Sequence, residues 1–217
     1  MNVEQARFNM IEQQIRPWDV LDPAVLALLA VVKREDFVPP AYRALAFVDT
    51  EVPLAEGQLM LAPRVEARML QELKVQRHET VLEIGTGSGF MAALLAHRAQ
   101  RVITLEDHPA LARMATDNLR RAGIANVSVR EADGRAGLAA EGPFDAIMLS
   151  GSVANVPQVL LDQLKTGGRL IAIEGAEPMM RAVLYTRQSG ASLSKVELFD
   201  TVAPRLDGFA EPTRFRF

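Results

Sequence analysis

Short apolar runs alternate with amphipathic segments along the chain from Thr80 onward. Short β-branched or apolar runs are typical of buried strands, whereas apolar residues at every third or fourth position are typical of helices. The pattern predicts strands at 80–84, 101–106, 127–131, 144–150, 169–175, 182–187 and 194–202, and helices at 90–99, 109–123 and 156–164. Strands separated by helices indicate a parallel sheet covered on both faces. The last two strands have no helix between them and can form an antiparallel hairpin at the edge of the sheet.

Residues 1–79 have a different pattern, with helical segments followed by a proline-rich, irregular part. We predict a helix over 3–15, a turn at 16–19, and a helix that begins at Pro23 with Asp22 as its N-cap. A further helix is expected from Arg64 to about Leu73. The chain therefore divides into an N-terminal helical and loop extension, 1–79, and an α/β domain, 80–217.

The charge balance argues against a polyanionic partner. The chain has 24 Lys and Arg against 27 Asp and Glu, a formal net charge of -3, so no general electrostatic attraction to nucleic acid or acidic membrane is expected. Its longest apolar stretch, which starts at Ala24, is far shorter than the roughly 20 residues that cross a bilayer. We expect a cytoplasmic protein without a secretory signal, and nothing in the pattern indicates an oligomeric state.

The residues typical of metal and thiol chemistry are few. The chain contains no cysteine, which excludes disulfides, thiolate nucleophiles and cysteine-based zinc sites. His78, His97 and His108 are far apart and lack the spacing of metal ligands. The sequence therefore predicts no metal site.

The segment "VLEIGTGSG" at 81–89 places three glycines directly after a predicted strand. A dinucleotide-binding loop needs a third glycine at the position of Phe90, where the helix packs closely on the strand. The lysine of a phosphate-binding P-loop is also missing. Pyrophosphate and triphosphate ligands are therefore disfavoured.

Acidic residues lie next to this loop and at the ends of the following two strands. Glu83 comes just before Gly85, Glu106 ends the second strand, and Asp133 follows the third. The carboxyl ends of parallel strands share one edge of a sheet, where ligands bind, and an acid in the place of Glu106 can accept hydrogen bonds from both ribose hydroxyls. A cationic ligand with a ribose and an amino group suits this edge.

The pattern E-x-G-x-G-x-G at 83–89, the acid at 106 and "ADG" at 132–134 together resemble the S-adenosylmethionine site of class I methyltransferases. The resemblance implies a Rossmann-like, seven-stranded sheet, mostly parallel with an antiparallel edge strand, and helices on both faces. It implies that the loop glycines pass the methionine part of S-adenosylmethionine, that Glu106 holds the ribose, and that Asp133 lies near the adenine. The expected cofactor-binding residues are Glu83, Gly85, Thr86, Gly87, Ser88, Gly89, Glu106, Asp133 and Gly134.

Four separated segments narrow the resemblance to one family. "VKREDFVPPAYRALAFVD" ending at Asp49, "LEIGTGSGFMAALLA" at 82–96, "ADGRAG" at 132–137 and "VPQVLLDQLKTGGRLI" at 156–171 are similar to the protein-L-isoaspartate O-methyltransferases. The resemblance implies methyl transfer to the free α-carboxylate of isoaspartyl residues in damaged proteins or peptides, after which the ester collapses to a succinimide. It also implies a role in protein repair, with the extension 1–79 covering the active site.

The chain departs from the family at the substrate side of the site. The family usually carries G-Q-T-I-S-x-P before the cofactor domain, and this chain has "GQLMLAP" at 57–63, with Leu61 in place of the serine. Met60, Leu61 and Pro63 are the candidate pocket residues. A lost hydrogen bond costs only about 0.5 to 1.5 kcal/mol net, so isoaspartyl methylation stays the first hypothesis. A small-molecule acceptor in a more apolar pocket, and a cofactor-binding protein without turnover, stay open as alternatives.

The expected reaction needs no general base, because a carboxylate is already a nucleophile and a sulfonium methyl is already activated. In-line placement in a water-poor pocket can contribute roughly 7 to 11 kcal/mol. Arg64 and Arg68 lie one helical turn apart and can either attract an acidic substrate or form a solvated helix face.

Overall fold

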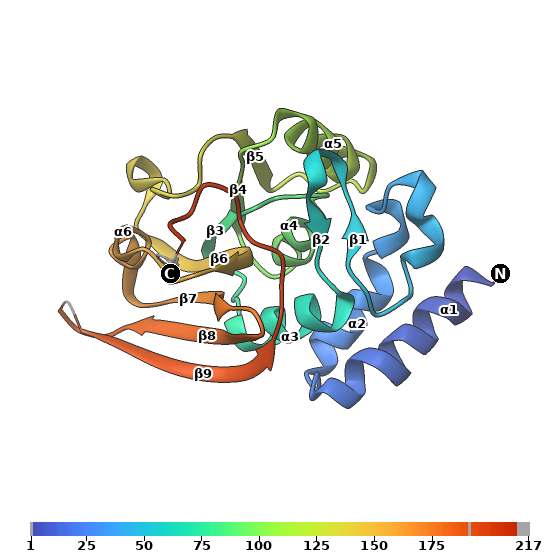
Figure 1. Cartoon of the computed structure of the whole chain (residues 1–217), viewed down its shortest axis with the longest axis horizontal. Helices are drawn as coiled ribbons and strands as arrows, with labels where there is room; N and C mark the ends of the chain where they lie inside the picture. Colours follow the sequence, from blue (N-terminus) through green and yellow to red (C-terminus); the bar gives the residue numbers. More distant parts are fainter. Residues whose placement is uncertain (1, 191, 212–217) are drawn as a thin grey trace, which may run out of the picture.

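The computed structural model describes residues 2–190 and 192–211, and its centre is a seven-stranded sheet (Figure 1). The strand order is β5-β4-β3-β6-β7-β8-β9, and β8 alone runs against its neighbours. The predicted edge hairpin is therefore confirmed as β8 and β9. The strands are β3 (Thr80–Ile84), β4 (Arg101–Glu106), β5 (Val127–Glu131), β6 (Phe144–Val153), β7 (Leu164–Ala176), β8 (Met179–Arg187) and β9 (Leu193–Thr201).

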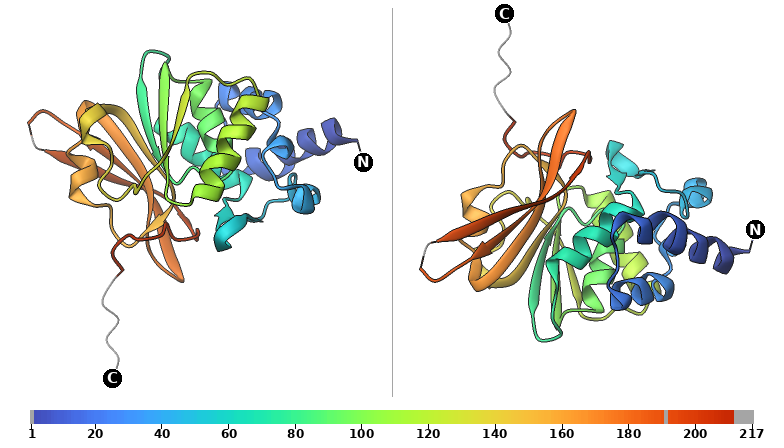
Figure 2. Two further views of the ribbon diagram at one scale, coloured as in Figure 1. Left: turned by 90° about the horizontal axis from the view of Figure 1, so that it is seen from above. Right: turned by 90° about the horizontal axis from the view of Figure 1, so that it is seen from below.

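Successive side chains of each strand point to opposite faces of the sheet, and the apolar ones form two hydrophobic clusters, one on each face. In β3, Val81 joins the first cluster and Leu82 and Ile84 join the second, as the two-residue period of a strand requires. The first cluster is covered by α3 (Pro63–Leu73), α4 (Phe90–Ala96) and α5 (Pro109–Arg121), together with the N-terminal part of the chain (Figure 2). The second is covered by α6 (Gln158–Leu161) and loops. The helix predicted at 156–164 is thus only one turn long, because β7 already begins at Leu164.

The N-terminal residues form several short elements rather than long helices. The helix predicted over 3–15 is α-helical only to Met10, continues as a π-helical turn, and ends in a 3-10 turn before Asp19, which is left-handed at φ 58°. Asp22 caps α2 as predicted, since its side chain accepts a 2.8 Å hydrogen bond from the amide of Ala24. The elements are α1 (Val3–Met10), η1 (Ile11–Ile15), η2 (Arg16–Trp18), α2 (Pro23–Val31), η3 (Arg34–Asp36), η4 (Pro40–Leu45), β1 (Val52–Pro53), η5 (Ala55–Gly57) and β2 (Leu59–Met60).

One hydrophobic cluster joins this N-terminal part to the sheet. Side chains as distant in sequence as Ile15, Phe37, Leu73 and Ile171 belong to it. The packing fixes the short β1–β2 hairpin and the start of α3 relative to the carboxyl edge of the sheet. Among residues 2–190 and 192–211, no helix is both long and apolar enough to cross a membrane.

Candidate active site

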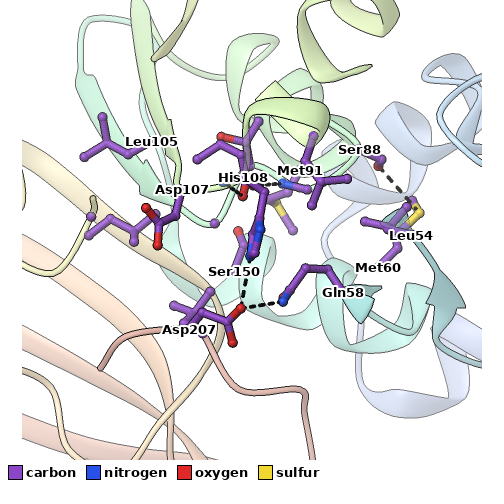
Figure 3. Close-up of a pocket in the computed structure, with 18 of the residues that line it drawn as sticks. Leu54, Gln58, Met60, Ser88, Met91, Leu105, Asp107, His108, Ser150 and Asp207 are labelled. Carbon is purple, nitrogen blue, oxygen red and sulfur yellow. Dashed lines mark hydrogen bonds and ion pairs between the residues drawn. The ribbon is translucent and has the colours of Figure 1, made fainter. Parts of the chain in front are cut away.

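A cavity opens at the carboxyl edge of β3, β4 and β6, between the sheet and the β1–β2 hairpin (Figure 3). It encloses about 750 Å³ of space, part of it open to solvent. The carboxyl edge of a sheet is where open α/β folds bind their ligands. The acids Glu106, Asp107, Asp133 and Asp207 line it, so its charge favours a cationic ligand.

The glycine loop adopts a backbone that other residues rarely adopt. Gly85, Gly87 and Gly89 have φ values of 90°, 52° and 85°, all in the left-handed region. A Cβ atom on Gly85 would lie 2.6 Å from Leu206 Cδ2, and one on Gly89 would lie 3.2 Å from Ala115 Cβ. The glycines therefore allow the C-terminal segment and α5 to approach the loop closely.

The position of Phe90 gives a packing reason for excluding a dinucleotide loop. Its side chain is buried and contacts Phe37 edge-on, with ring centroids 5.5 Å apart. The ring thus anchors the start of α4 in the core, where a dinucleotide-binding fold would bring the helix onto the strand with a glycine.

Glu106 lies at the end of β4, as the sequence indicated, and it lines the cavity. Its Oε2 accepts a 2.8 Å hydrogen bond from the amide of Gly87, and its Oε1 accepts one of 3.1 Å from the amide of His108. Burial raises the pKa of Glu106, although these two amides pull it down. Each carboxylate oxygen has more than one lone pair, so the group can still accept hydrogen bonds from a ligand on the cavity side.

Glu83 is fully buried behind the cavity wall and is not among the residues that line the cavity. It accepts 2.7 Å hydrogen bonds from the hydroxyls of Thr104 and Ser150, and Thr104 also lies 2.6 Å from the hydroxyl of Thr86. Burial raises the pKa of Glu83 to about 8, against the effect of both hydroxyls. Glu83 therefore ties the loop to the ends of β4 and β6, while Thr86 and Ser88 line the cavity.

Asp133 and Gly134 line the cavity after β5. Asp133 is half exposed and accepts a 2.8 Å hydrogen bond from Arg135 Nε, which lowers the pKa of Asp133. A Cβ atom on Gly134 would lie 2.4 Å from Ile84 Cγ2, so this turn fits against β3 only without a side chain. The "ADG" motif thus combines an acid at the rim with a glycine required by packing.

Two of the three candidate residues for the substrate pocket line the cavity, and the third does not. Met60 and Leu61 are buried and line the cavity, and the hydroxyl of Ser88 donates to Met60 Sδ at 3.6 Å. Pro63 begins α3 and is buried, but it does not line the cavity. Glu66, one turn into the same helix, does line it, although the sequence pattern gave no reason to select this residue.

Arg64 and Arg68 both interact with neighbouring residues of the protein. Arg64 pairs with Asp49 at 2.6 Å and lies over the ring of Trp18, 4.0 Å from its centroid. Arg68 donates to Glu72 at 2.9 Å and to the carbonyl oxygen of Trp18 at 2.8 Å. Neither arginine lines the cavity, and both hold the N-terminal part against α3.

The C-terminal segment closes one side of the cavity with residues that the sequence did not single out. Asp207 Oδ2 accepts a 2.7 Å hydrogen bond from Gln58 Nε2 and lies 3.0 Å from His108 Nε2 (Figure 3). Leu206 is held by its amide, which donates to the carbonyl oxygen of Ser152 at 2.9 Å. The segment lies outside the named strands, so the periodicity that predicted the strands gave no reason to select it.

Among residues 2–190 and 192–211, no three His, Cys, Asp or Glu side chains are grouped so that they could hold a metal ion. Glu106, Glu83 and Asp133 are instead hydrogen-bonded to backbone amides, hydroxyls and an arginine, respectively.

Comparison with known proteins agrees with the family resemblance seen in the sequence. The family model described as "Protein-L-isoaspartate(D-aspartate) O-methyltransferase (PCMT)" matches residues 5–201. The chain is 40% identical to a protein-L-isoaspartate O-methyltransferase of Methanoculleus marisnigri over 85% of its own length and 84% of the relative's. It is 41% identical to protein-L-isoaspartate O-methyltransferase 1 of Syntrophobacter fumaroxidans over 85% and 86%.

A solved structure supports the fold assignment. The crystal structure of a putative protein-L-isoaspartate O-methyltransferase from Plasmodium falciparum, in complex with S-adenosyl-L-homocysteine, superposes with a TM-score of 0.79. The match covers 93% of this chain and 98% of that one at 21% identity, and it therefore concerns the fold alone.

Proposed function

The chain belongs to the protein-L-isoaspartate(D-aspartate) O-methyltransferase family, and from this premise we propose that it methylates the free α-carboxylate of isoaspartyl residues in proteins or peptides. The methyl donor is S-adenosylmethionine. The acceptor oxygen forms a bond to the methyl carbon as the carbon–sulfur bond breaks, and the electron pair of that bond stays on sulfur. We further propose that the reaction serves protein repair in the cytoplasm.

The observation that carries the proposal is the pairing of the glycine loop with Glu106 at the carboxyl edge of the sheet. The left-handed glycines leave room for a ligand to lie against the loop backbone, and Glu106 is locked beside them by the amide of Gly87. A carboxylate at this place suits a ribose diol. The acids that line the cavity suit the net positive charge of S-adenosylmethionine, which has a sulfonium and an ammonium group.

The remaining cofactor contacts are proposals of the same kind. Thr86 and Ser88 would lie along the methionine part, Asp133 and Gly134 would border the adenine, and Glu83 would act from behind by holding the loop. Asp133 already shares its carboxylate with Arg135, so its contact with an adenine amino group would use the oxygen lone pairs that remain.

The chain's own residues would contribute positioning and exclusion of water. The β1–β2 hairpin supplies Met60 and Leu61 to the wall, and the C-terminal segment supplies Leu206 and Asp207. We propose that the extension 1–79 covers the active site through Met60 and Leu61. Since no proton has to leave the acceptor carboxylate, a leucine at position 61 in place of a hydroxyl residue is compatible with turnover.

The apolar wall at Met60 and Leu61 favours one other candidate function, methylation of a small molecule with an apolar body. Two peptides that differ only in an isoaspartyl or an aspartyl linkage separate the two functions. The purified protein is incubated with S-adenosylmethionine and each peptide, and S-adenosylhomocysteine and peptide mass are measured. We expect methylation of the isoaspartyl peptide alone. Cofactor binding without methylation of either peptide would refute the isoaspartyl proposal and leave the small-molecule acceptor or a protein without turnover.

A further inference from the structure

Glu66 is a buried carboxyl group in the wall of the cavity. It is 3% exposed, lies on α3, and lines the same cavity as Met60 and Leu61. Phe90 and Met91 line the cavity as well. An acid enclosed by such apolar side chains has a high desolvation cost unless it is paired or protonated.

Arg34 pairs with Glu66 only weakly. Its Nε lies 3.4 Å from Glu66 Oε2, whereas Nη1 and Nη2 donate to the carbonyl oxygens of Ala46 and Leu61 at 3.0 and 2.8 Å. No residue in the described part of the chain donates a hydrogen bond to Glu66 Oε1. The same guanidinium therefore holds the backbone of Leu61 and one oxygen of Glu66, and the other oxygen stays available to a ligand in the cavity.

Few charges act on Glu66. Burial raises the pKa of Glu66 to about 7, and Arg34 lowers it in part. Glu83 is the other buried acid close enough to interact with it, and Asp49 acts on Arg34. The helices α2 and α4, which pack against α3, contain no titratable side chain.

The other elements packed against α3 have their charged groups paired elsewhere. These pairs are Glu12 with Arg16 for η1, Lys165 with Asp145, Arg169 with Glu79 and Glu174 with Lys195 for β7, and Arg181 with Asp200 for β8. Arg187 donates to the carbonyl oxygens of Leu161 and Asp162, and Tyr185 donates to Glu174.

The protonation state of Glu66 determines whether its side chain repels a carboxylate in the cavity or can donate a hydrogen bond to it. An ionised Glu66 would repel a carboxylate in a site of low dielectric. A protonated Glu66 can instead donate its O–H to that carboxylate, in a charge-assisted hydrogen bond. A carboxylate acceptor and a protonated Glu66 therefore stabilise each other.

We propose that Glu66 is a specificity-determining residue that donates a hydrogen bond from its carboxyl group to the carboxylate of the methyl acceptor. Glu66 thereby supplies the donor that Leu61 cannot, from the neighbouring helix α3. The assignment of the acceptor as a carboxylate rests on the proposed function. Acceptor binding then requires the protonated form, so the apparent affinity falls as that form is depleted.

The test is the pH dependence of kcat and KM for an isoaspartyl peptide. For the unmodified protein we expect KM to rise roughly tenfold between about pH 6 and about pH 8, with kcat changing little. Glu66→Gln keeps a donor of similar shape and removes the titration, so its KM should be nearly independent of pH. Glu66→Met keeps the volume and removes the donor, so its KM at about pH 6 should be raised about tenfold or more.

Glu72→Gln is the matched control, because Glu72 lies on the same helix, pairs with Arg68 and does not line the cavity. Its KM profile should coincide with that of the unmodified protein. A KM profile of Glu66→Gln that still rises with pH would overturn the proposal, as would an unchanged KM in Glu66→Met. Thermal unfolding of each variant checks that the fold is retained.

Direct binding separates this proposal from the proposed function. Isoaspartyl peptide is titrated into the protein saturated with S-adenosylhomocysteine, and its affinity is measured by fluorescence anisotropy over the same pH range. Binding that weakens with pH only when Glu66 is present, without methylation in the turnover assay, would support Glu66 and refute the proposed function. Methylation of the isoaspartyl peptide, with binding that does not depend on Glu66, would support the proposed function and refute the role of Glu66. No binding at any pH would refute both proposals.

Discussion

Glu106 gives the sharpest test of the cofactor site, through the substitution Glu106→Gln. The side chain keeps its size, but it loses its charge and one of its two acceptor oxygens. In the structure these oxygens accept from the amides of Gly87 and His108, at 2.8 and 3.1 Å. In the glutamine variant, an NH2 group faces one of those amides, and ribose hydroxyls held at the proposed place would meet a neutral group.

The expected size of the effect follows from these contacts. A hydrogen bond to a charged group contributes about 1.5 to 3 kcal/mol, and each 1.4 kcal/mol is about a factor of ten. The dissociation constant should therefore rise roughly 10-fold to 150-fold. S-adenosylmethionine and S-adenosylhomocysteine contain the same ribose, so both should be weakened to a similar extent, and kcat at saturating cofactor should change much less than KM.

Isothermal titration calorimetry with both ligands measures the effect. Glu131→Gln is the matched control, since Glu131 is the exposed neighbour of Glu106 across β4 and β5 and does not line the cavity. It should bind both ligands as the unmodified protein does. An affinity of Glu106→Gln within about twofold of the unmodified protein would refute the ribose assignment, because the lost contact would then be too weak to matter. Weakening of one ligand alone would also contradict it.

Two further predictions concern the buried acid and the altered pocket wall. Burial raises the pKa of Glu83 from 4.5 in an exposed carboxyl to about 8, so its protonated form favours folding below about pH 4.5, and this stability is lost as the pH rises through about 8. The free energy of unfolding in urea, measured across this pH range, should fall less steeply with pH for Glu83→Gln than for the unmodified protein. If the two proteins lose stability in parallel, Glu83 is not protonated in the folded state. Leu61→Ser introduces a hydroxyl at the cavity wall and should raise kcat/KM for an isoaspartyl peptide about two-fold to tenfold, by the net value of one hydrogen bond. A lower kcat/KM in a variant that unfolds at the normal temperature would mean that the apolar wall itself serves the acceptor.

Several parts of the fold follow from the sequence alone. The strands predicted at 80–84, 101–106 and 127–131 are confirmed residue by residue as β3, β4 and β5. The mainly apolar runs of β3 and β4 are typical of strands buried on both faces. The strand β5 lies at the edge of the sheet, is only partly buried, and alternates valine with polar residues. The antiparallel hairpin of β8 and β9 followed from the missing helix between them. The glycine loop and Glu106 were identified from local spacing, since their arrangement depends on a turn that directly follows a strand.

Other elements were predicted less well because neighbouring structure determines them. The helix predicted over 3–15 changes to a π-helical turn after Met10, where its side chains fit into the core beside α3. The helix predicted at 156–164 is reduced to one turn by β7, which extends back to Leu164. Local propensity is a weak preference, and packing overrides it in both places.

The sequence by itself determined the sheet and the position of the glycine loop and the acids at the carboxyl ends of its strands, because these depend on short-range patterns along the chain. Tertiary structure decided which acids reach the cavity: Glu83 points into the core from β3, whereas Glu106 reaches the loop from β4. It also brought Asp207 to His108, 99 residues earlier in the chain, and placed Glu66 beside the backbone of Leu61 through Arg34. Such contacts join residues whose separation along the chain has no period, so only the packing of the whole chain specifies them.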